Sequence, residues 1–438
     1  IRNGGTLSLA APGARMTATP ALNVFTGGTL TMAGDEFVNS FTGNGTVNGT
    51  GNLNTLHTIL NNSSVSVPLN TLTLTSDGVS AVLSDVVVAS SAVVNSGELT
   101  VGNGAAGSLT LQPGGTLTVQ AGATLAYQRN TPVTLGDVAG TGTLRQKGSS
   151  ELHLAGSVTA STVRVDAGTL VLDTGSSNRV PDTSQIVVST GATLRLDDFA
   201  EVVDHLSLGG TLAPGGLLFT NTATLQAGAA LNNMLVATSV NVTGAATIDA
   251  VLNTNIVNVG ATGHLSVQTG SLLPSADVGV APSGRLSLSA DQTVQTLALG
   301  GTLDGAGLLT AVGGVTLQLG GQTNTALAGG TLTVTGNATL VAPALMGTVN
   351  INAGTLTLAG GNLLDDAANV TVAPSAGLAL GSDETVGTLA LAGTLSGTGH
   401  LLHTNGLTTL QAGALVSANL GAATLLVTGN STLQGTAS

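Results

Sequence analysis

Cysteine and tryptophan are missing from this chain of 438 residues, which has one tyrosine, five phenylalanines and only 7% charged residues. A soluble globular protein has about 25% charged residues. A charged surface and large core side chains are therefore both scarce, which argues against a compact α-helical or α/β enzyme. The absence of cysteine excludes a disulfide framework and thiolate ligation of a metal.

Positive charge is also scarce, with nine Lys and Arg against 22 Asp and Glu and a formal net charge of −13. Nucleic-acid binding needs clustered cations, and binding to anionic lipid needs a polybasic segment. The sequence has neither, and no apolar run reaches the 18 residues of a membrane-spanning helix. We therefore expect no nucleic-acid partner and no membrane insertion of this segment.

Glycine, leucine and threonine dominate instead. A hydrophobic content of 42% is too high for a disordered coil, and 11 prolines without a three-residue glycine period exclude collagen. The tripeptide Gly-Thr-Leu occurs eleven times, within alternating stretches such as 116–119, 331–334 and 355–358. Apolar residues alternating with hydroxyl residues predict strands, and glycine supplies the positive φ that corners need. The chain is predicted to be all-β.

A longer repeat overlies the short one. Residues 291–307 match residues 383–399 at a shift of 92, so that residues 186–438 hold nearly three copies of one module. With about 18–23 residues per coil, such a module comprises four or five coils, and whole coils can be gained or lost. We predict one continuous parallel β-solenoid over residues 1–438, with about 20–24 coils. Irregular coils or a loop are expected at 36–70.

One segment supports a family resemblance. Residues 137–172 contain Gly140-Thr-Gly-Thr-Leu144, then Lys147-Gly148, Leu152-His-Leu154-Ala-Gly156 and Val163-Arg-Val-Asp-Ala-Gly-Thr-Leu170. This pattern resembles the autotransporter-associated β-strand repeat. The resemblance implies a type V secreted passenger, or a related filamentous-haemagglutinin-like bacterial surface protein, built as a right-handed parallel β-helix. It also implies an extracellular or cell-surface location.

The densest group of ionisable residues is Asp197, Asp198, Glu201, Asp204 and His205. Paired carboxylates of this kind could bind Ca²⁺ or act as acid and base. We interpret them as an acidic, solvated loop, because the corresponding stretches 291–292 and 383–384 keep only part of the charge.

Two smaller groups contain residue types that metal binding or catalysis uses. His400 and His403 lie three apart, so on a strand they would point to opposite faces and could not share a metal. Tyr127-Gln128-Arg129 is the one place with an aromatic beside a cation, and it is interpreted as a corner loop; the nine basic residues otherwise look scattered. We therefore predict no catalytic residue, no metal site and no cofactor.

Two binding surfaces are conceivable. The Thr-x-Thr alternation of 71–75 resembles a hydroxyl face that orders water, although ordinary strand propensity explains it as well. Asn-x-Ser/Thr sequons are either glycan acceptors or turn residues; they include those at Asn44, Asn48, Asn62, Asn241, Asn337, Asn369 and Asn430.

The prediction that follows is a secreted, non-enzymatic β-solenoid that serves as a cell-surface stalk, fibre or adhesin passenger. The alternatives are a polysaccharide-active β-helix enzyme and an ice- or glycan-binding solenoid. The expected partners are further copies of the chain, associating end to end or laterally, and host or cell-surface receptors or glycans. End-to-end association is expected because both ends of the sequence consist of repeat text without capping features.

Overall fold

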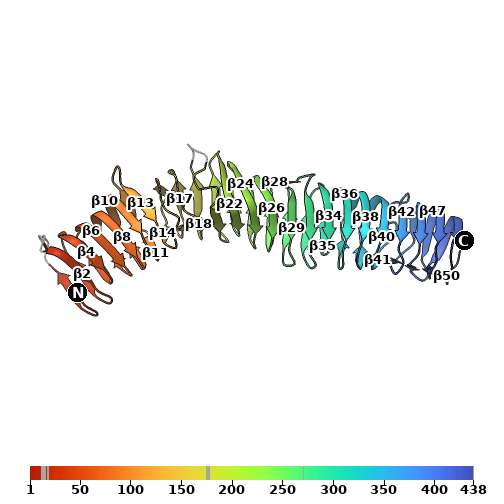
Figure 1. The fold of residues 1–438 in the computed structure, drawn as a ribbon, viewed down its shortest axis with the longest axis horizontal. Coiled ribbons are helices and arrows are strands. Elements are labelled where there is room, and N and C mark those ends of the chain that lie inside the picture. Colours follow the sequence, from red (N-terminus) through yellow and green to blue (C-terminus); the bar gives the residue numbers. More distant parts are fainter. Residues whose placement is uncertain (11–15, 17–18, 174–177, 270, 438) are drawn as a thin grey trace. The chain divides into compact units, whose positions relative to one another are not determined.

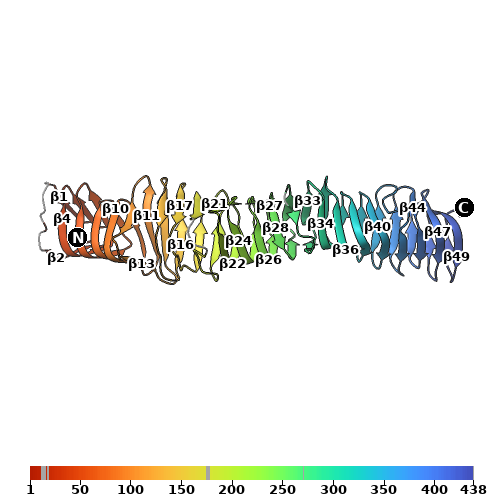
Figure 2. The ribbon, with the colours of Figure 1, turned by 90° about the horizontal axis from the view of Figure 1, so that it is seen from above.

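A computed structural model describes residues 1–10, 16, 19–173, 178–269 and 271–437. These residues form β-strands and no helix, and the strands stack in parallel as a right-handed β-helix of about 23 turns. The predicted fold class and number of coils are confirmed. Figure 1 and Figure 2 show the strands in two views at right angles. Within the described residues, no apolar helix of membrane-spanning length exists.

The chain divides into two compact units, residues 1–220 and 221–438, and each is described by itself. In the first unit, one ladder runs through the following strands: β1 (Thr6–Leu9), β3 (Thr29–Met32), β5 (Thr46–Gly49), β7 (Ser64–Val65), β9 (Val79–Val82), β11 (Glu98–Gly104), β14 (Thr124–Arg129), β16 (Thr143–Gln146), β18 (Thr162–Val165), β20 (Gln185–Val188) and β22 (Ala200–Leu208).

A second ladder of the first unit contains long strands and ends in two short ones: β2 (Thr19–Val24), β4 (Glu36–Gly43), β6 (Leu53–Asn61), β8 (Leu69–Asp77), β10 (Asp85–Val94), β12 (Ser108–Leu111) and β13 (Thr116–Val119). A third ladder starts after it: β15 (Val133–Leu135), β17 (Glu151–Leu154), β19 (Thr169–Leu172), β21 (Thr193–Leu196) and β23 (Thr211–Leu212).

The second unit has two ladders, and the range of β24 (Leu217–Leu225) contains the division between the units. The first ladder comprises β26 (Leu235–Val242), β28 (Val251–Thr254), β29 (Ile256–Val259), β31 (Ser271–Leu272), β32 (Asp277–Val280), β34 (Gln292–Leu299), β36 (Leu309–Leu317), β38 (Leu327–Val334), β40 (Ala344–Ile351), β42 (Asn369–Val372), β44 (Glu384–Val386), β45 (Thr388–Leu391), β47 (Leu401–Leu410) and β49 (Asn419–Val427). The second comprises β25 (Ala229–Leu231), β27 (Ala245–Ile248), β30 (His264–Val267), β33 (Arg285–Leu288), β35 (Thr302–Gly305), β37 (Gln322–Thr323), β39 (Ala338–Leu340), β41 (Thr355–Leu358), β43 (Gly377–Leu380), β46 (Thr394–Ser396), β48 (Leu415–Val416) and β50 (Thr432–Leu433).

The core of each unit is a stack of inward leucine, valine and alanine side chains. The leucine of every Gly-Thr-Leu tripeptide is buried except Leu7, in the first strand. Successive turns pair like residues in register, for example Leu303 with Leu286. Each pairing therefore extends an apolar column through the unit, as the alternation predicts.

Glycine is required where one turn passes closely over another. Gly305, at the end of β35, has φ +112, and a Cβ added there would lie 2.0 Å from the carbonyl oxygen of Leu288. No other residue type fits that space or adopts that φ without strain.

The structure differs from the sequence-based expectation for one segment and shows no flat hydroxyl face in another. Residues 36–70 form regular paired strands rather than a loop. The alternation in 71–75 does not present a flat hydroxyl face, because β8 turns a corner in its middle. Thr71 is buried and bonds to Thr55 at 2.9 Å between hydroxyl oxygens, whereas Leu72 is 41% exposed.

Candidate functional site

In the part of the first unit that the structure describes, a wall is interrupted between β12 and β15. These strands lie in consecutive turns, yet they belong to different sheets: β12 pairs with β10, and β15 pairs with β17. On either side of the break the same turns remain joined, through the Thr118–Ala139 bridge and the β11–β14 ladder. We call the opening between β12 and β15 the seam. It encloses a cavity of about 400 Å³.

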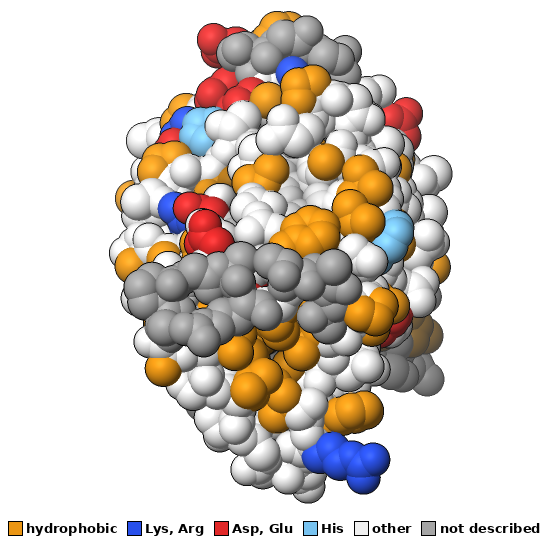
Figure 3. Space-filling view, turned by 90° about the vertical axis from the view of Figure 1, so that its left-hand side faces the viewer, with side chains coloured by type: hydrophobic (Ala, Val, Ile, Leu, Met, Phe, Trp, Pro, Cys, Tyr) orange, Lys and Arg blue, Asp and Glu red, His pale blue; other side chains and the backbone are white. Residues whose placement is uncertain are grey.

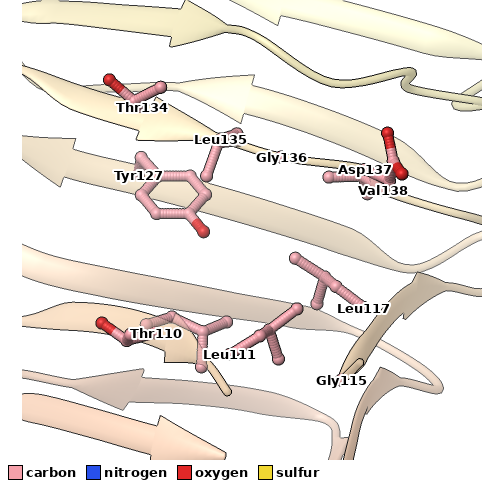
Figure 4. Close-up of a pocket in the computed structure, with 11 residues that line it drawn as sticks. Thr110, Leu111, Gly115, Leu117, Tyr127, Thr134, Leu135, Gly136, Asp137 and Val138 are labelled. Carbon is pink, nitrogen blue, oxygen red and sulfur yellow. The ribbon is translucent and has the colours of Figure 1, made fainter. Parts of the chain in front are cut away.

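The seam exposes core positions. Leu109 and Leu111 of β12 align with Val86 and Val88 of β10, which are completely buried, but both leucines are partly exposed. Their exposure follows from the missing ladder above them. Figure 4 shows the cavity between Leu111 and Leu117 on one side and Leu135 on the other. The seam therefore exposes an apolar surface, which in other turns is covered by the next strand of the ladder.

Tyr127, the only tyrosine of the chain, lies in this cavity. The sequence placed it in a corner loop, but it lies within β14 with 1% of its surface exposed. Its hydroxyl points into the cavity and has no hydrogen-bond partner. Burial raises the pKa of Tyr127, so that the hydroxyl remains a neutral donor. A buried hydroxyl without a partner costs free energy, so a ligand that accepts a hydrogen bond from Tyr127 would recover that cost.

The neighbours of Tyr127 do not join it in the cavity. Gln128 is exposed, and the guanidinium of Arg129 donates to the carbonyl oxygen of Gly107 and to the hydroxyl of Thr131.

An ion-pair cluster ties together the turns on both sides of the seam. The Glu98 carboxylate of β11 lies 2.8 Å from Nη1 of Arg145 and 2.9 Å from Nζ of Lys147. Between Glu98 and Arg145 lies the turn of β14, whose outward Ala126 is completely buried beneath them. Burial alone would raise the pKa of Glu98, but hydrogen bonds from Lys147 and Thr100 outweigh it and lower that pKa. We call this cluster the clamp.

A second cluster covers another face of the same unit. Glu151 bonds to Arg195 at 2.8 Å and to His153 at 2.9 Å, and His153 bonds to Asp173 at 2.6 Å. Burial would lower the pKa of His153, but its two carboxylate partners raise it. Asp197 belongs here, because its carboxylate lies 3.0 Å from Nε of Arg195. Several basic residues that looked scattered in the sequence are thus gathered in ion pairs.

Glu201 corrects the interpretation of 197–205 as a solvated loop. Its side chain is 2% exposed, and its two oxygens each accept a backbone N–H at 2.9 Å, from Arg179 and Val180 of the preceding turn. Asn178, at φ 58, turns the backbone so that these N–H groups point inward. Burial raises the pKa of Glu201 more than the two bonds lower it. Asp198 and Asp204 are exposed, so the acidic residues do not converge on one site.

The same arrangement recurs in the second unit. Glu384 accepts the N–H groups of Leu363 at 2.9 Å and Leu364 at 2.8 Å, after Asn362 at φ 50. At the corresponding position, Gln292 accepts the N–H of Leu272 at 2.9 Å. We call such a buried Glu or Gln a staple, because it joins its turn to the preceding one.

An aspartate directly precedes both Gln292 and Glu384, and it bonds to the following turn instead of the preceding one. Asp291 accepts the N–H of Leu308, and Asp383 that of Leu401, both at 2.8 Å in the following turn. The residues at 291–292 and 383–384 therefore each hold three consecutive turns together.

His400 and His403 do not form a metal site with their neighbours. Nδ1 of His400 lies 3.9 Å from Oδ1 of Asp383, and His403 is exposed on β47. Among the residues that the structure describes, no group of three His, Asp or Glu side chains could hold a metal ion. The seam and the clamp are therefore the candidate functional features of the chain. Neither was predicted from the sequence.

Comparison with known proteins adds no identification: no family model matches the chain, and no curated protein or solved structure matches it.

Proposed function

We propose that the chain is a secreted, non-enzymatic β-solenoid that acts as a stalk, fibre or adhesin passenger at a bacterial cell surface. The observation that carries the proposal is the joining of consecutive turns by parallel ladders, buried apolar columns and staples. Each turn rises by about 4.8 Å and is bonded along its ladders to the turns before and after it, so adding turns lengthens the stack without interrupting its hydrogen bonds or its core. The resemblance of residues 137–172 to the autotransporter-associated repeat supports the surface location.

Three acidic residues singled out in the sequence make structural bonds, which supports a non-catalytic role. Glu201 and Glu384 hold backbone N–H groups, and Asp197 holds Arg195. Polysaccharide-cleaving enzymes instead direct two carboxyl groups at one bond.

The location can be tested on cells that carry the native gene. Antibodies against the purified chain should label intact cells at the surface, as seen by immunogold electron microscopy. A cytoplasmic marker protein, stained in parallel, controls for leakage. Labelling that requires permeabilised cells would overturn the surface assignment.

We further propose that copies of the chain associate through exposed apolar turns. Leu425 and Val427 of β49 are exposed, although their ladder partners Thr408 and Leu410 in β47 are buried. Figure 3 shows hydrophobic side chains on the face of the first unit that lies at the left of Figure 1. Sedimentation should show species larger than 42.3 kDa that grow with concentration. A single monomeric species at millimolar concentration would contradict association.

A further inference from the structure

The facing edges of the seam carry backbone groups without ladder partners. Alternate residues of a strand direct their N–H and C=O groups to opposite neighbours. The N–H of Gln112 donates to Val88 in β10, so the backbone groups of Leu109 and Leu111 face the seam. Across the seam, the carbonyl of Leu135 accepts from Ala155 beyond β17, so the backbone groups of Thr134 face the seam. Two strand edges thus border one cavity.

The cavity has the size of a short piece of strand. Three residues of strand extend about 10 Å, occupy about 4.8 Å between neighbours and fill about 10 Å through the sheet, or roughly 500 Å³. The cavity measures about 400 Å³, and its edges are the four residues Ser108–Leu111 and the three residues Val133–Leu135. The length of the two strand edges and the volume of the cavity therefore both correspond to an extended segment of about three residues.

We propose that the seam binds an extended peptide segment of a partner protein as an added parallel strand between β12 and β15. Apolar side chains of the segment cover Leu109 and Leu111, and its backbone pairs with the two edges. The Tyr127 hydroxyl donates to a small polar side chain at one inward position. Asp137 at the rim and the net charge of −13 favour an uncharged or basic segment over an acidic one.

Strand addition at an open edge is a general mode of peptide recognition, in which main-chain bonds provide affinity and pockets provide specificity. The clamp fits this role. It holds the turns of β11, β14 and β16 together on one face, while the β12–β15 face stays open. The added strand occupies the existing cavity of about 400 Å³ on the open face. The proposal does not depend on the cellular location of the protein.

The test uses the whole chain and a six-residue peptide, acetyl-Lys-Ser-Leu-Thr-Leu-Lys-amide, whose centre copies residues 108–111. Because the chain has one tyrosine and no tryptophan, its intrinsic fluorescence reports on Tyr127 alone. We expect a saturable fluorescence change at sub-millimolar to millimolar peptide. The same peptide N-methylated at both leucines keeps the side chains but loses two ladder donors, and should bind at least fivefold more weakly.

A matched pair of variants tests the edge itself. Thr134→Pro removes an N–H that faces the seam, and proline is tolerated at an edge strand, so the fold should persist by circular dichroism. This variant should lose at least fivefold in peptide affinity, whereas Thr134→Val, which keeps the N–H, should bind as the wild type does.

Three results would each overturn the proposal. The first is no saturable change up to several millimolar peptide, and the second is equal binding of the N-methylated peptide. The third is a fluorescence change with hexan-1-ol but none with the peptide, which would show a cavity for small molecules instead. If Thr134→Pro fails to fold, the N-methylated peptide still decides between strand addition and side-chain contact alone.

Discussion

Replacing Glu384 by alanine should destabilise its part of the second unit by about 2–5 kcal/mol. The change removes both acceptors of the Leu363 and Leu364 N–H groups, which lie in a buried turn. Each buried donor left without a partner costs about 1–3 kcal/mol, and relief of the desolvated carboxylate returns part of that cost. Because a solenoid turn contacts only its neighbours, the loss should stay local.

Native-state hydrogen exchange, followed by mass spectrometry, measures this loss where it occurs. A loss of 2 kcal/mol corresponds to roughly 30-fold faster exchange at the amides of Leu363 and Leu364. Exchange in β26, remote in the sequence, should not change and provides an internal control. Unchanged protection of Leu363 and Leu364 in Glu384→Ala would refute the staple as a stabilising element.

The pH dependence of the same site has a definite sign. Burial raises the pKa of Glu384 above the unfolded value of 4.5, and repulsion from Asp366 adds to this effect. The folded state thus binds the proton more tightly, and the wild type loses stability as pH rises from 4.5 through the folded pKa. Glu384→Gln, which reproduces the natural staple Gln292, should lack this loss. A wild type that gains stability relative to Glu384→Gln over that interval would contradict the assignment.

Three further predictions address other features. Glu98→Gln should destabilise the clamp by about 1–2 kcal/mol near neutral pH. Since the pKa of Glu98 is lowered, the difference should disappear as pH falls from 4.5 through the folded pKa, measured by thermal unfolding of both proteins. Gly305→Ala should cost at least about 2 kcal/mol, because φ is +112 and the carbonyl of Leu288 is too close; equal melting temperatures would contradict this. His153 should titrate by NMR above pH 6.5, and its pair with Asp173 should stabilise the fold below pH 6.5 and lose that effect as pH rises through the folded pKa.

The sequence could predict the parallel β-helix because its signals repeat in every turn. Gly-Thr-Leu marks a corner followed by an inward leucine. Because the tripeptide recurs, a wrong interpretation of one copy does not change the predicted fold. Tyr127 was also within reach: it lies two residues after the buried Leu125, so the two-residue period places it inward. The interpretation of 127–129 as a corner loop was based on the neighbouring Arg129 and did not use this two-residue period.

The staples and the seam could not be predicted in the same way. Glu201 is polar and lies in an acidic stretch, so its burial becomes evident only beside the N–H groups that Asn178 turns inward one coil earlier. The signal is an Asn at positive φ followed 22 or 23 residues later by Glu, as in Asn178 with Glu201 and Asn362 with Glu384. The seam is a missing pairing, and the sequence of Val133–Leu135 alternates as any paired strand does.

The position of the clamp relative to the seam has an energetic reason. Where β12 and β15 lack a ladder, the two turns lose several backbone bonds and the burial of Leu109 and Leu111. Each remaining link between these turns must therefore carry more of their cohesion. The Glu98–Arg145 pair adds to these links, because it is partly buried and holds the turn of β11 to the turn of β16 across Ala126 of the intervening turn. A β-solenoid can in this way keep an open edge on one face without loss of its stacking on another.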